Sequence, residues 1–306
     1  MNLIKEDIHN RILEKKRELD AARPLPPEIV KKLHEQMQVE YTYNSNAIEG
    51  NTLSLRETQI VIEEGITIRG KSLKEVMEAR NHPEAITYVE SLSKRDIEES
   101  DVLKIHELIF KGIDVNAGAY RTGQVRITGA EFLPPPPQQV KPRMVELLDW
   151  LHKNPDELRP IEFAALFHHR LVYIHPFFEG NGRVARLLMN CILLRHGYPF
   201  VIVLRNDRVR YYRTLKEADL GNFSPFVNFI ARSIERSLNL YLSAIGRREV
   251  ITLEEASKAT GHSQEYLSLL ARKGSIDAFK IGRKWMLTKL ALEDYMLKGS
   301  TKHPSA

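Results

Sequence analysis

Hydrophobic positions along the chain recur mostly at intervals of three and four residues, the spacing of an amphipathic α-helix. A long helix is predicted to start at Pro26-Pro27 and to stop at Gly50, where glycine can adopt the left-handed C-terminal conformation. The same periodicity predicts further helices over residues 55–64, 72–91, 97–110, 140–152, 161–174, 183–195, 209–218 and 225–244. The fold is therefore predicted to be mainly α.

One internal segment alternates like a β-hairpin instead. Residues 124–127 and 131–133 flank a predicted turn at Thr128, Gly129 and Ala130. Four prolines follow, and they end the second strand because proline cannot donate to a strand ladder. The proline run itself is interpreted as a stiff connector.

Beyond Gly246 the pattern changes to short elements. Helices are predicted over residues 252–259, 263–272 and about 289–297, with a hairpin over 278–287 that turns at Gly282-Arg283. We expect three regions: an N-terminal helical region over 1–95, a central core over 96–245, and a small winged helix-turn-helix domain over 247–300. Residues 247–306 hold 11 Lys and Arg against 7 Asp and Glu, most of the net charge of +5. This surplus favours nucleic acid as a partner, although a solvated basic face explains it equally well.

Composition excludes several classes of protein. The content of 42% hydrophobic and 28% charged residues is typical of a globular protein. No apolar run reaches the roughly 18 residues of a membrane span, and the start of the chain lacks the apolar core of a secretion signal. Cys191 has no partner for a disulfide. These features predict a cytoplasmic protein without a membrane partner.

The string HPFFEGNGRVAR, residues 175–186, carries the candidate chemistry. Pro176 should end the preceding helix near His175, since a residue before proline avoids helical geometry. Gly180-Asn181-Gly182 can turn its N–H groups toward one anion, and a helix starting near Arg183 adds its positive end. Arg183 and Arg186 lie on one helix face and can both reach a multiply charged anion.

Two further residues of this string suggest a reaction. Glu179, an acid amid positive groups, suits a Mg²⁺ ion that bridges phosphate oxygens. His175 has an ordinary pKa near neutrality and can take a proton from an attacking hydroxyl. The set predicts phosphoryl or nucleotidyl transfer rather than a loop whose histidine only packs. The lone helical histidines, in contrast, are interpreted as structural: His106, His168 and His169.

The string matches the motif HxFx[DE]GN[GK]RxxR at every specified position, and the chain resembles the Fic family on these residues. The resemblance implies a helical core with a hairpin flap that transfers AMP from ATP, with Mg²⁺, to a Ser, Thr or Tyr hydroxyl of a target protein. His175 would be the base and Glu179 the metal ligand. Gly182 stands where the kinase-like Doc branch has lysine, which favours AMP transfer.

The resemblance also implies the nucleotide contacts. Arg183 would bind the α and β phosphates and Arg186 the γ phosphate, while Phe177 would anchor the loop. The remaining contacts would come from the anion hole, the flap turn and a later helix: Gly180, Asn181, Gly182, Thr128, Gly129, Ala130, Tyr211, Tyr212 and Asp219. The flap edge would hold the target peptide. An ordinary hairpin and core tyrosines are the alternatives.

A second string, SNAIEGN, ends the first long helix. Ser45 and Glu49 share one helix face, and an acid at the negative end of a helix calls for a basic partner. The string resembles the inhibitory [ST]xxxE[GN] motif of class II Fic proteins. By this resemblance Glu49 pairs with Arg186 where the γ phosphate must bind, and Ser45 steadies the contact. An exposed helix-end glutamate is the alternative.

The basic tail resembles excisionase and MerR-like domains. The helix over residues 263–272 would enter the major groove of DNA, and Arg283 and Lys284 would contact phosphates. Such domains also dock proteins, so that function stays open.

Three functions follow as hypotheses. The first is an autoinhibited AMP transferase. The second is a DNA-binding regulator with a nucleotide-sensing core. The third is removal of AMP by water that Glu49 activates. Another nucleotide donor and a homodimer are left open.

Overall fold

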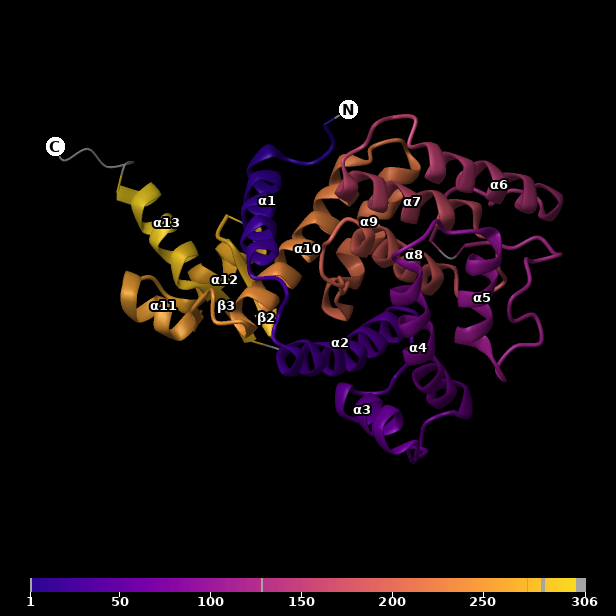
Figure 1. Cartoon of the computed structure of the whole chain (residues 1–306), viewed down its shortest axis with the longest axis horizontal. Coiled ribbons are helices and arrows are strands. Elements are labelled where there is room, and N and C mark those ends of the chain that lie inside the picture. The colour runs from indigo at the N-terminus through magenta and orange to yellow at the C-terminus, as the bar shows by residue number, and fades with distance from the viewer. Residues whose placement is uncertain (1, 128, 274, 282–283, 301–306) are drawn as a thin grey trace. The chain divides into compact units, whose positions relative to one another are not determined.

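A computed structural model describes residues 2–127, 129–273, 275–281 and 284–300 (Figure 1). The contacts divide the chain into two compact units. Unit 1 comprises Met1–Asn10 and His34–Ile234, and unit 2 comprises Arg11–Leu33 and Glu235–Ala306. Each unit thus combines segments that are distant in the sequence.

Helices build unit 1, as the sequence predicts. The long helix α2 (Pro27–Ile48) stops just before the predicted Gly50, and α3 (Leu55–Glu64) has the predicted bounds. The helices that follow lie within three residues of their predicted ends: α4 (Leu73–Leu92), α5 (Glu99–Phe110), α6 (Pro137–Lys153), α7 (Pro160–Ile174), α8 (Asn181–Arg195), α9 (Arg208–Asp219) and α10 (Ser224–Ala244). None of the helices in the described ranges combines the length and apolar character needed to cross a bilayer.

The starts of α3 and α4 are set by capping boxes. Ser54 and Ser72 each accept the backbone N–H of the glutamate three residues later, Glu57 and Glu75. Each glutamate side chain in turn accepts the N–H of its serine, so two otherwise unpaired donors are satisfied. Local sequence thereby fixes where α4 begins, and its first turns face the candidate site described below.

The core of unit 1 is the pair α7 and α8, which pack against each other (Figure 1). Every residue of α8 from Asn181 to Leu193 except Gly182 is buried, and the buried residues include Arg183, Arg186 and Asn190. Helix α4 packs on α8 as well as on α3 and α5. The loop that carries the chemistry joins α7 to α8, so it is held by the most buried part of the unit.

The predicted hairpin over residues 124–133 is not formed as a pair of strands in the described part of that segment. A turn exists where predicted, since Ala130 donates its N–H to the carbonyl of Ile127 at 3.1 Å. Side-chain bonds replace the ladder: the Gln124 amide donates to the carbonyl of Pro134 at 3.1 Å. The prolines at 134–137 limit any second strand to residues 131–133, which is too short to form a ladder on its own.

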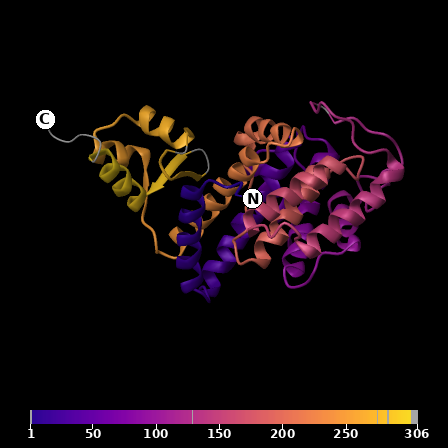
Figure 2. The ribbon, with the colours of Figure 1, turned by 90° about the horizontal axis from the view of Figure 1, so that it is seen from above.

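Unit 2 contains the three described strands, which form an antiparallel sheet in the order β1-β3-β2 (Figure 2). Strands β2 (Ala278–Ile281) and β3 (Lys284–Thr288) are the predicted hairpin, whose turn at Gly282-Arg283 lies outside the described residues. Strand β1 (Val250–Thr252) was not predicted. The helices α11 (Leu253–Thr260), α12 (Gln264–Lys273) and α13 (Lys289–Ser300) agree with the predicted ones, and a small apolar core joins them to the sheet.

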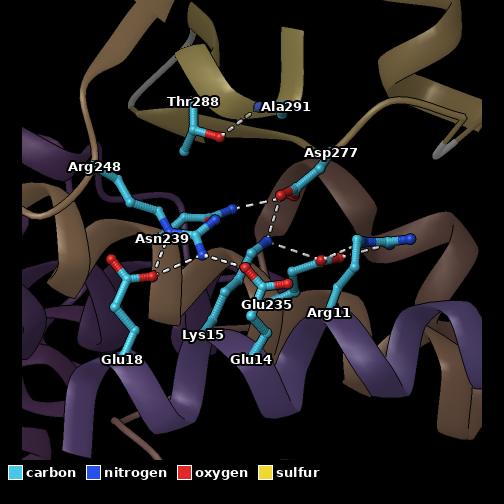
Figure 3. A network of polar contacts seen from close by, with 10 residues as sticks. All are labelled: Arg11, Glu14, Lys15, Glu18, Glu235, Asn239, Arg248, Asp277, Thr288 and Ala291. Carbon is cyan, nitrogen blue, oxygen red and sulfur yellow. Dashed lines mark hydrogen bonds and ion pairs between the residues drawn. The ribbon is translucent and has the colours of Figure 1, made fainter. Parts of the chain in front are cut away.

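Unit 2 also includes most of α1 (Glu6–Ala21) and the end of α10. Both lie outside the predicted C-terminal domain, which starts at residue 247. A buried polar network joins these helices to the sheet domain (Figure 3). Lys15 of α1 pairs with Glu235 of α10 at 2.9 Å and with Asp277, which precedes β2. Arg11 pairs with the same Glu235 at 2.8 Å, and Asn239 donates to Asp277 at 3.2 Å. The C-terminal domain is thus bonded to two helices from elsewhere in the chain.

Candidate active site

The loop between α7 and α8 begins at His175, which ends α7 with a left-handed backbone (φ 54°). Few residues other than glycine adopt this conformation, so the turn needs support. Buried Arg121 supplies it: Nε donates to the carbonyl of His175 at 2.7 Å, and its N–H donates to the carbonyl of Pro176 at 2.9 Å. The turn that presents His175 is therefore held by a residue 54 positions earlier.

Phe177 anchors the loop, as expected. It is fully buried, and its ring stacks on His106 of α5 with centroids 3.8 Å apart. His106 accepts the N–H of Gly118 at Nδ1 (2.9 Å), so its Nε2 donates to the carbonyl of Glu179 (3.2 Å). Burial lowers the pKa of His106 to about 4, which keeps this neutral form. His106 thus has the structural role expected for it.

An uncapped helix start forms the floor of the site. Gly180 precedes α8 with φ 80°, and a Cβ there would lie 2.2 Å from the ring of Phe110, so only glycine fits. The first turn of α8 receives no side-chain cap. The Asn181 side chain instead bonds both the N–H and the carbonyl of Phe177, each at 2.9 Å. The free N–H groups and the helix dipole make this point an anion site.

Glu179 lies at the edge of the anion site, half exposed, with Lys74 of α4 at 2.7 Å. No group of three His, Cys, Asp or Glu side chains among the described residues could hold a metal on its own. Mg²⁺ commonly takes one or two carboxylates and completes its shell with phosphates and water. One carboxylate beside an anion site fits that pattern, so Glu179 could hold Mg²⁺ together with a bound phosphate.

The structure brings Ser45, Glu49 and Arg186 together. The Arg186 side chain is 1% exposed, and its Nη2 lies 2.9 Å from Oε1 of Glu49. It also donates to the carbonyl of Ser45 at 2.8 Å, and its Nε donates to Oγ of Ser45 at 3.1 Å. Burial opposes ionisation of Glu49, but Arg186 and Arg183 outweigh it and hold the pKa of Glu49 below its ordinary value. Glu49 is therefore the charged partner of Arg186.

Gly182 makes this pairing possible. A Cβ at this position would lie 2.5 Å from Oε1 of Glu49 and 3.0 Å from Nη1 of Arg186. The carboxylate thus rests directly on the first turn of α8, and any side chain at position 182 would force it to move.

A cavity of about 410 Å³ opens over these groups. It is lined from α2, α4 and the loop by residues that include Glu49, Lys74, Glu78, His175, Glu179 and Arg183. Arg183, the other motif arginine, is also paired with a carboxylate, since its Nη1 lies 2.8 Å from Glu78. His175, Glu179 and Arg183 thus line one cavity, and Arg186 is joined to it through Glu49, which also lines the cavity.

The protonation state of His175 suits a base. Its Nδ1 lies 3.3 Å from the carbonyl of Val172, which can only accept, so Nδ1 carries the proton and Nε2 keeps a lone pair. Burial, helped by the charge of Arg121, lowers the pKa of His175 to about 4 against an opposing effect of Glu49. The imidazole is therefore neutral at neutral pH.

The residues predicted to contact adenosine lie in different surroundings. Tyr211 is buried, and its hydroxyl lies 2.9 Å from Nε2 of His168. The hydroxyl of the more exposed Tyr212 lies 3.5 Å from Oε2 of Glu49. Asp219 pairs with His169 at 2.9 Å and lines a separate cavity of about 600 Å³. Their contacts with a nucleotide stay predictions.

The flap turn also stays a prediction as a nucleotide contact. Gly129 and Ala130 form the described part of the turn, and Thr128 lies outside the described residues. Beside it, Glu131 pairs with Lys216 of α9 at 2.6 Å, which links the flap to that helix.

Sequence reasoning missed four residues that touch the site: Arg121, Glu78, Lys74 and Asn51. The first three lie 54 to 105 positions from their partners in residues 175–183 and belong to no motif. Only Asn51 offered a signal, because it is the last residue of the SNAIEGN string.

The chain is similar to known proteins. The Fic/DOC family matches residues 96–193 of the chain. The chain is 41% identical over 220 residues to the protein adenylyltransferase Fic of Nematostella vectensis, which covers 70% of this chain and 51% of that relative. The chain therefore spans about half the length of the curated relatives it matches.

Solved structures agree with this match. A Fic domain containing signaling protein from Bacteroides thetaiotaomicron is 30% identical with a TM-score of 0.73, covering 77% of this chain and 98% of that one. A Fic family protein from Desulfovibrio desulfuricans G20 is 25% identical with a TM-score of 0.66, covering 93% and 96%. The second match extends into the C-terminal domain, since the uncovered part of this chain is smaller than that domain.

Proposed function

Because the chain belongs to the Fic/DOC family, we propose that it is a protein adenylyltransferase. It would transfer AMP from ATP to a Ser, Thr or Tyr hydroxyl of a target protein. The observation that carries this proposal is the neutral His175 at a cavity that also holds Arg183 and the uncapped start of α8. Relatives named protein adenylyltransferase support it.

The reaction assigns one task to each group. The target hydroxyl oxygen bonds to the α phosphorus of ATP, and the bond from that phosphorus to the β-bridging oxygen breaks, which releases pyrophosphate. Nε2 of His175 takes the hydroxyl proton. Arg183 and the N–H groups of the α8 start hold the phosphates, and Glu179 would hold Mg²⁺, which neutralises phosphate charge when bound.

Glu49 would restrain this activity. Its carboxylate is paired with Arg186, so a γ phosphate that approaches this guanidinium would be repelled by the negative charge of Glu49. ATP would then bind in a pose that does not align its α phosphorus with the hydroxyl. Removing the carboxylate, as in Glu49→Gly, would free Arg186.

Labelled ATP tests both points. The wild type, Glu49→Gly, His175→Ala and the double variant would be incubated with ATP labelled at the α phosphate, Mg²⁺ and a lysate. We expect strong protein labelling with Glu49→Gly, weak labelling with the wild type, and none with either His175→Ala form. Label from the γ position instead, or label independent of His175, would overturn the proposal.

Removal of AMP is the second candidate, favoured because Glu49 lines the same cavity as His175. In this reading the Glu49 carboxylate takes a proton from water, and the water oxygen bonds to the AMP phosphorus. The bond from that phosphorus to the target oxygen breaks, and the target leaves as a hydroxyl that has regained a proton, with AMP as the other product. A target labelled by Glu49→Gly would be given to the wild type. Loss of label with the wild type, but not with Glu49→Gly, would assign this second activity.

The C-terminal domain would bind DNA. Helix α12 carries exposed Arg272, and β3 begins with exposed Lys284, both suited to phosphates. Binding of the full chain to duplex DNA should weaken as salt rises, and Arg272→Ala should lower that salt slope by about 1. Lys141→Ala, at an exposed position of α6, is the control. Binding that is absent or does not depend on salt would leave protein docking as the role of this domain. It would also exclude the hypothesis of a DNA-binding regulator with a nucleotide-sensing core.

Cytoplasmic residence and a homodimer complete the proposal. Light scattering of the purified chain tests the dimer.

A further inference from the structure

The first turns of α4 reach three parts of the site. Lys74 pairs with Glu179, and Glu75 accepts both the N–H and the hydroxyl of Thr52 at 2.7 Å. Glu78, one turn further, pairs with Arg183. Helix α4 therefore contacts the metal-ligand candidate, the segment after Glu49, and a motif arginine.

The pair between Glu78 and Arg183 is buried. Their side chains are 9% and 4% exposed, and the guanidinium lies 4.6 Å from the ring centre of Phe110. Nε of Arg183 is buried without a partner in the described structure, so the pair with Glu78 does not satisfy every donor of this guanidinium. A buried charge without its partner is strongly unfavourable, so Arg183 depends on a nearby carboxylate.

Asn51 fixes the second oxygen of Glu78. Its Nδ2 donates to Oε2 of Glu78 and to the carbonyl of Glu75, both at 3.0 Å. Its own N–H donates to the carbonyl of Asn46 in the last turn of α2 at 3.1 Å. Glu78 is thus held by the same short segment that carries Glu49.

Each of the two motif arginines is therefore paired with its own carboxylate, Arg183 with Glu78 and Arg186 with Glu49. Glu49 rests on Gly182, directly beside Arg183 in the chain, and the charge of Arg183 already acts on it. Among the described residues, four carboxylates line the cavity: Glu49, Glu75, Glu78 and Glu179. Glu75 is bonded to Thr52 and Glu179 to Lys74. If Glu78 no longer held Arg183, the guanidinium would therefore turn to Glu49.

We propose that Glu78 is a positioning residue that keeps Arg183 apart from Glu49 and ready for phosphate. The proposal rests on the proposed function only for the identity of the nucleotide. Loss of Glu78 would let Glu49 engage both arginines and would tighten the restraint on ATP. The effect of Glu78 must then depend on whether Glu49 is present.

Calorimetry with α,β-methylene ATP and Mg²⁺ tests this, because that analogue cannot release pyrophosphate and no target is needed. Glu78→Gln should weaken binding about tenfold when Glu49 is present, and change it by less than about twofold beside Glu49→Gly. Glu84→Gln, an exposed position on the same helix, is the matched control and should change neither.

Equal weakening in both backgrounds would show a merely structural role and overturn the proposal. Tighter binding with Glu49 present would also overturn it, since Glu78 would then compete with phosphate. If Glu78→Gln does not fold, Asn51→Ala should give a smaller loss, again only with Glu49. A dependence on Glu49 without any AMP transfer would sustain this inference while the proposed function fails.

Discussion

At the residue scale, Gly182 shows how closely Glu49 rests on α8. A methyl group there would meet the Glu49 carboxylate at 2.5 Å. We expect Gly182→Ala to displace Glu49 and raise AMP transfer about tenfold, equivalent to about 1.4 kcal/mol. Initial rates with labelled ATP measure this. Beside Glu49→Gly the same change should have little effect, and a complete loss of rate there would mean that the methyl group blocks phosphate instead.

The pKa of His175 predicts the acid side of the pH profile. Only the neutral imidazole can accept a proton, and burial lowers the pKa of His175 to about 4. The rate should therefore persist as pH falls through 6.5 and decline only toward pH 4. The profile of kcat/KM for Glu49→Gly measures this, since removing Glu49 removes an effect that raises the pKa. An acid limb centred near 6.5 would contradict the prediction.

The candidate site residues could be predicted because they are contiguous within two strings. Residues 175–186 and the SNAIEGN string supplied His175, Glu179, Arg186 and Glu49. The groups that hold them were not predictable. Arg121 is a single arginine with no periodic pattern, and its contacts with the loop exist only after folding.

At the scale of elements, the loop and the flap segment share one support. Arg121 donates to the carbonyls of His175, Gly123 and Pro135 at 2.7, 3.0 and 2.5 Å. Arg121→Ala should abolish most transfer and lower the free energy of unfolding by about 3 kcal/mol or more, since three carbonyls lose a charged donor. Denaturant unfolding and initial rates measure this. Arg126→Ala, at an exposed position of the same segment, should leave stability unchanged.

Elements with regular periodicity were predictable, and those with polar core positions were not. Helix α1 was missed because its buried face carries Lys15 between Ile12 and Leu19, which interrupts the apolar stripe. The hairpin over residues 124–133 was wrong because alternation cannot tell a strand pair from an extended loop held by side chains.

At the scale of the whole molecule, buried histidines set the response to acid. Burial lowers the pKa of His82 to about 3 and of His106 to about 4, and that of His168 well below its ordinary value. The folded chain then binds fewer protons than the unfolded chain below pH 6.5, so stability present above that pH is lost as pH falls. Each of these three histidines should lower the free energy of unfolding by about 2 kcal/mol when the pH falls from 7 to 5.

Thermal unfolding at pH 7 and pH 5 measures this loss. The Tm should be lower at pH 5 than at pH 7. His82→Phe should make this difference smaller, because phenylalanine binds no proton in the unfolded chain. An unchanged Tm would mean that these side chains stay solvated.

The two units show what the predicted regions lack. A boundary near residue 246 marks where the sequence pattern changes, but Lys15 bonds both Glu235 and Asp277, across 220 and 262 positions. Pairings over such separations leave no local signature in the sequence.

The network around Asp277 bears on how the C-terminal domain can be handled. A fragment that starts at Arg247 keeps Asp277 but leaves behind Lys15, Glu235 and Asn239. Asp277 would then lack the lysine with which it is paired in the intact chain. Arg248 would also lose its two carboxylate partners, Glu14 and Glu18. Truncation at the apparent linker would therefore yield a more poorly folded piece with altered charge, and its affinity for a polyanion would say little about the full-length protein.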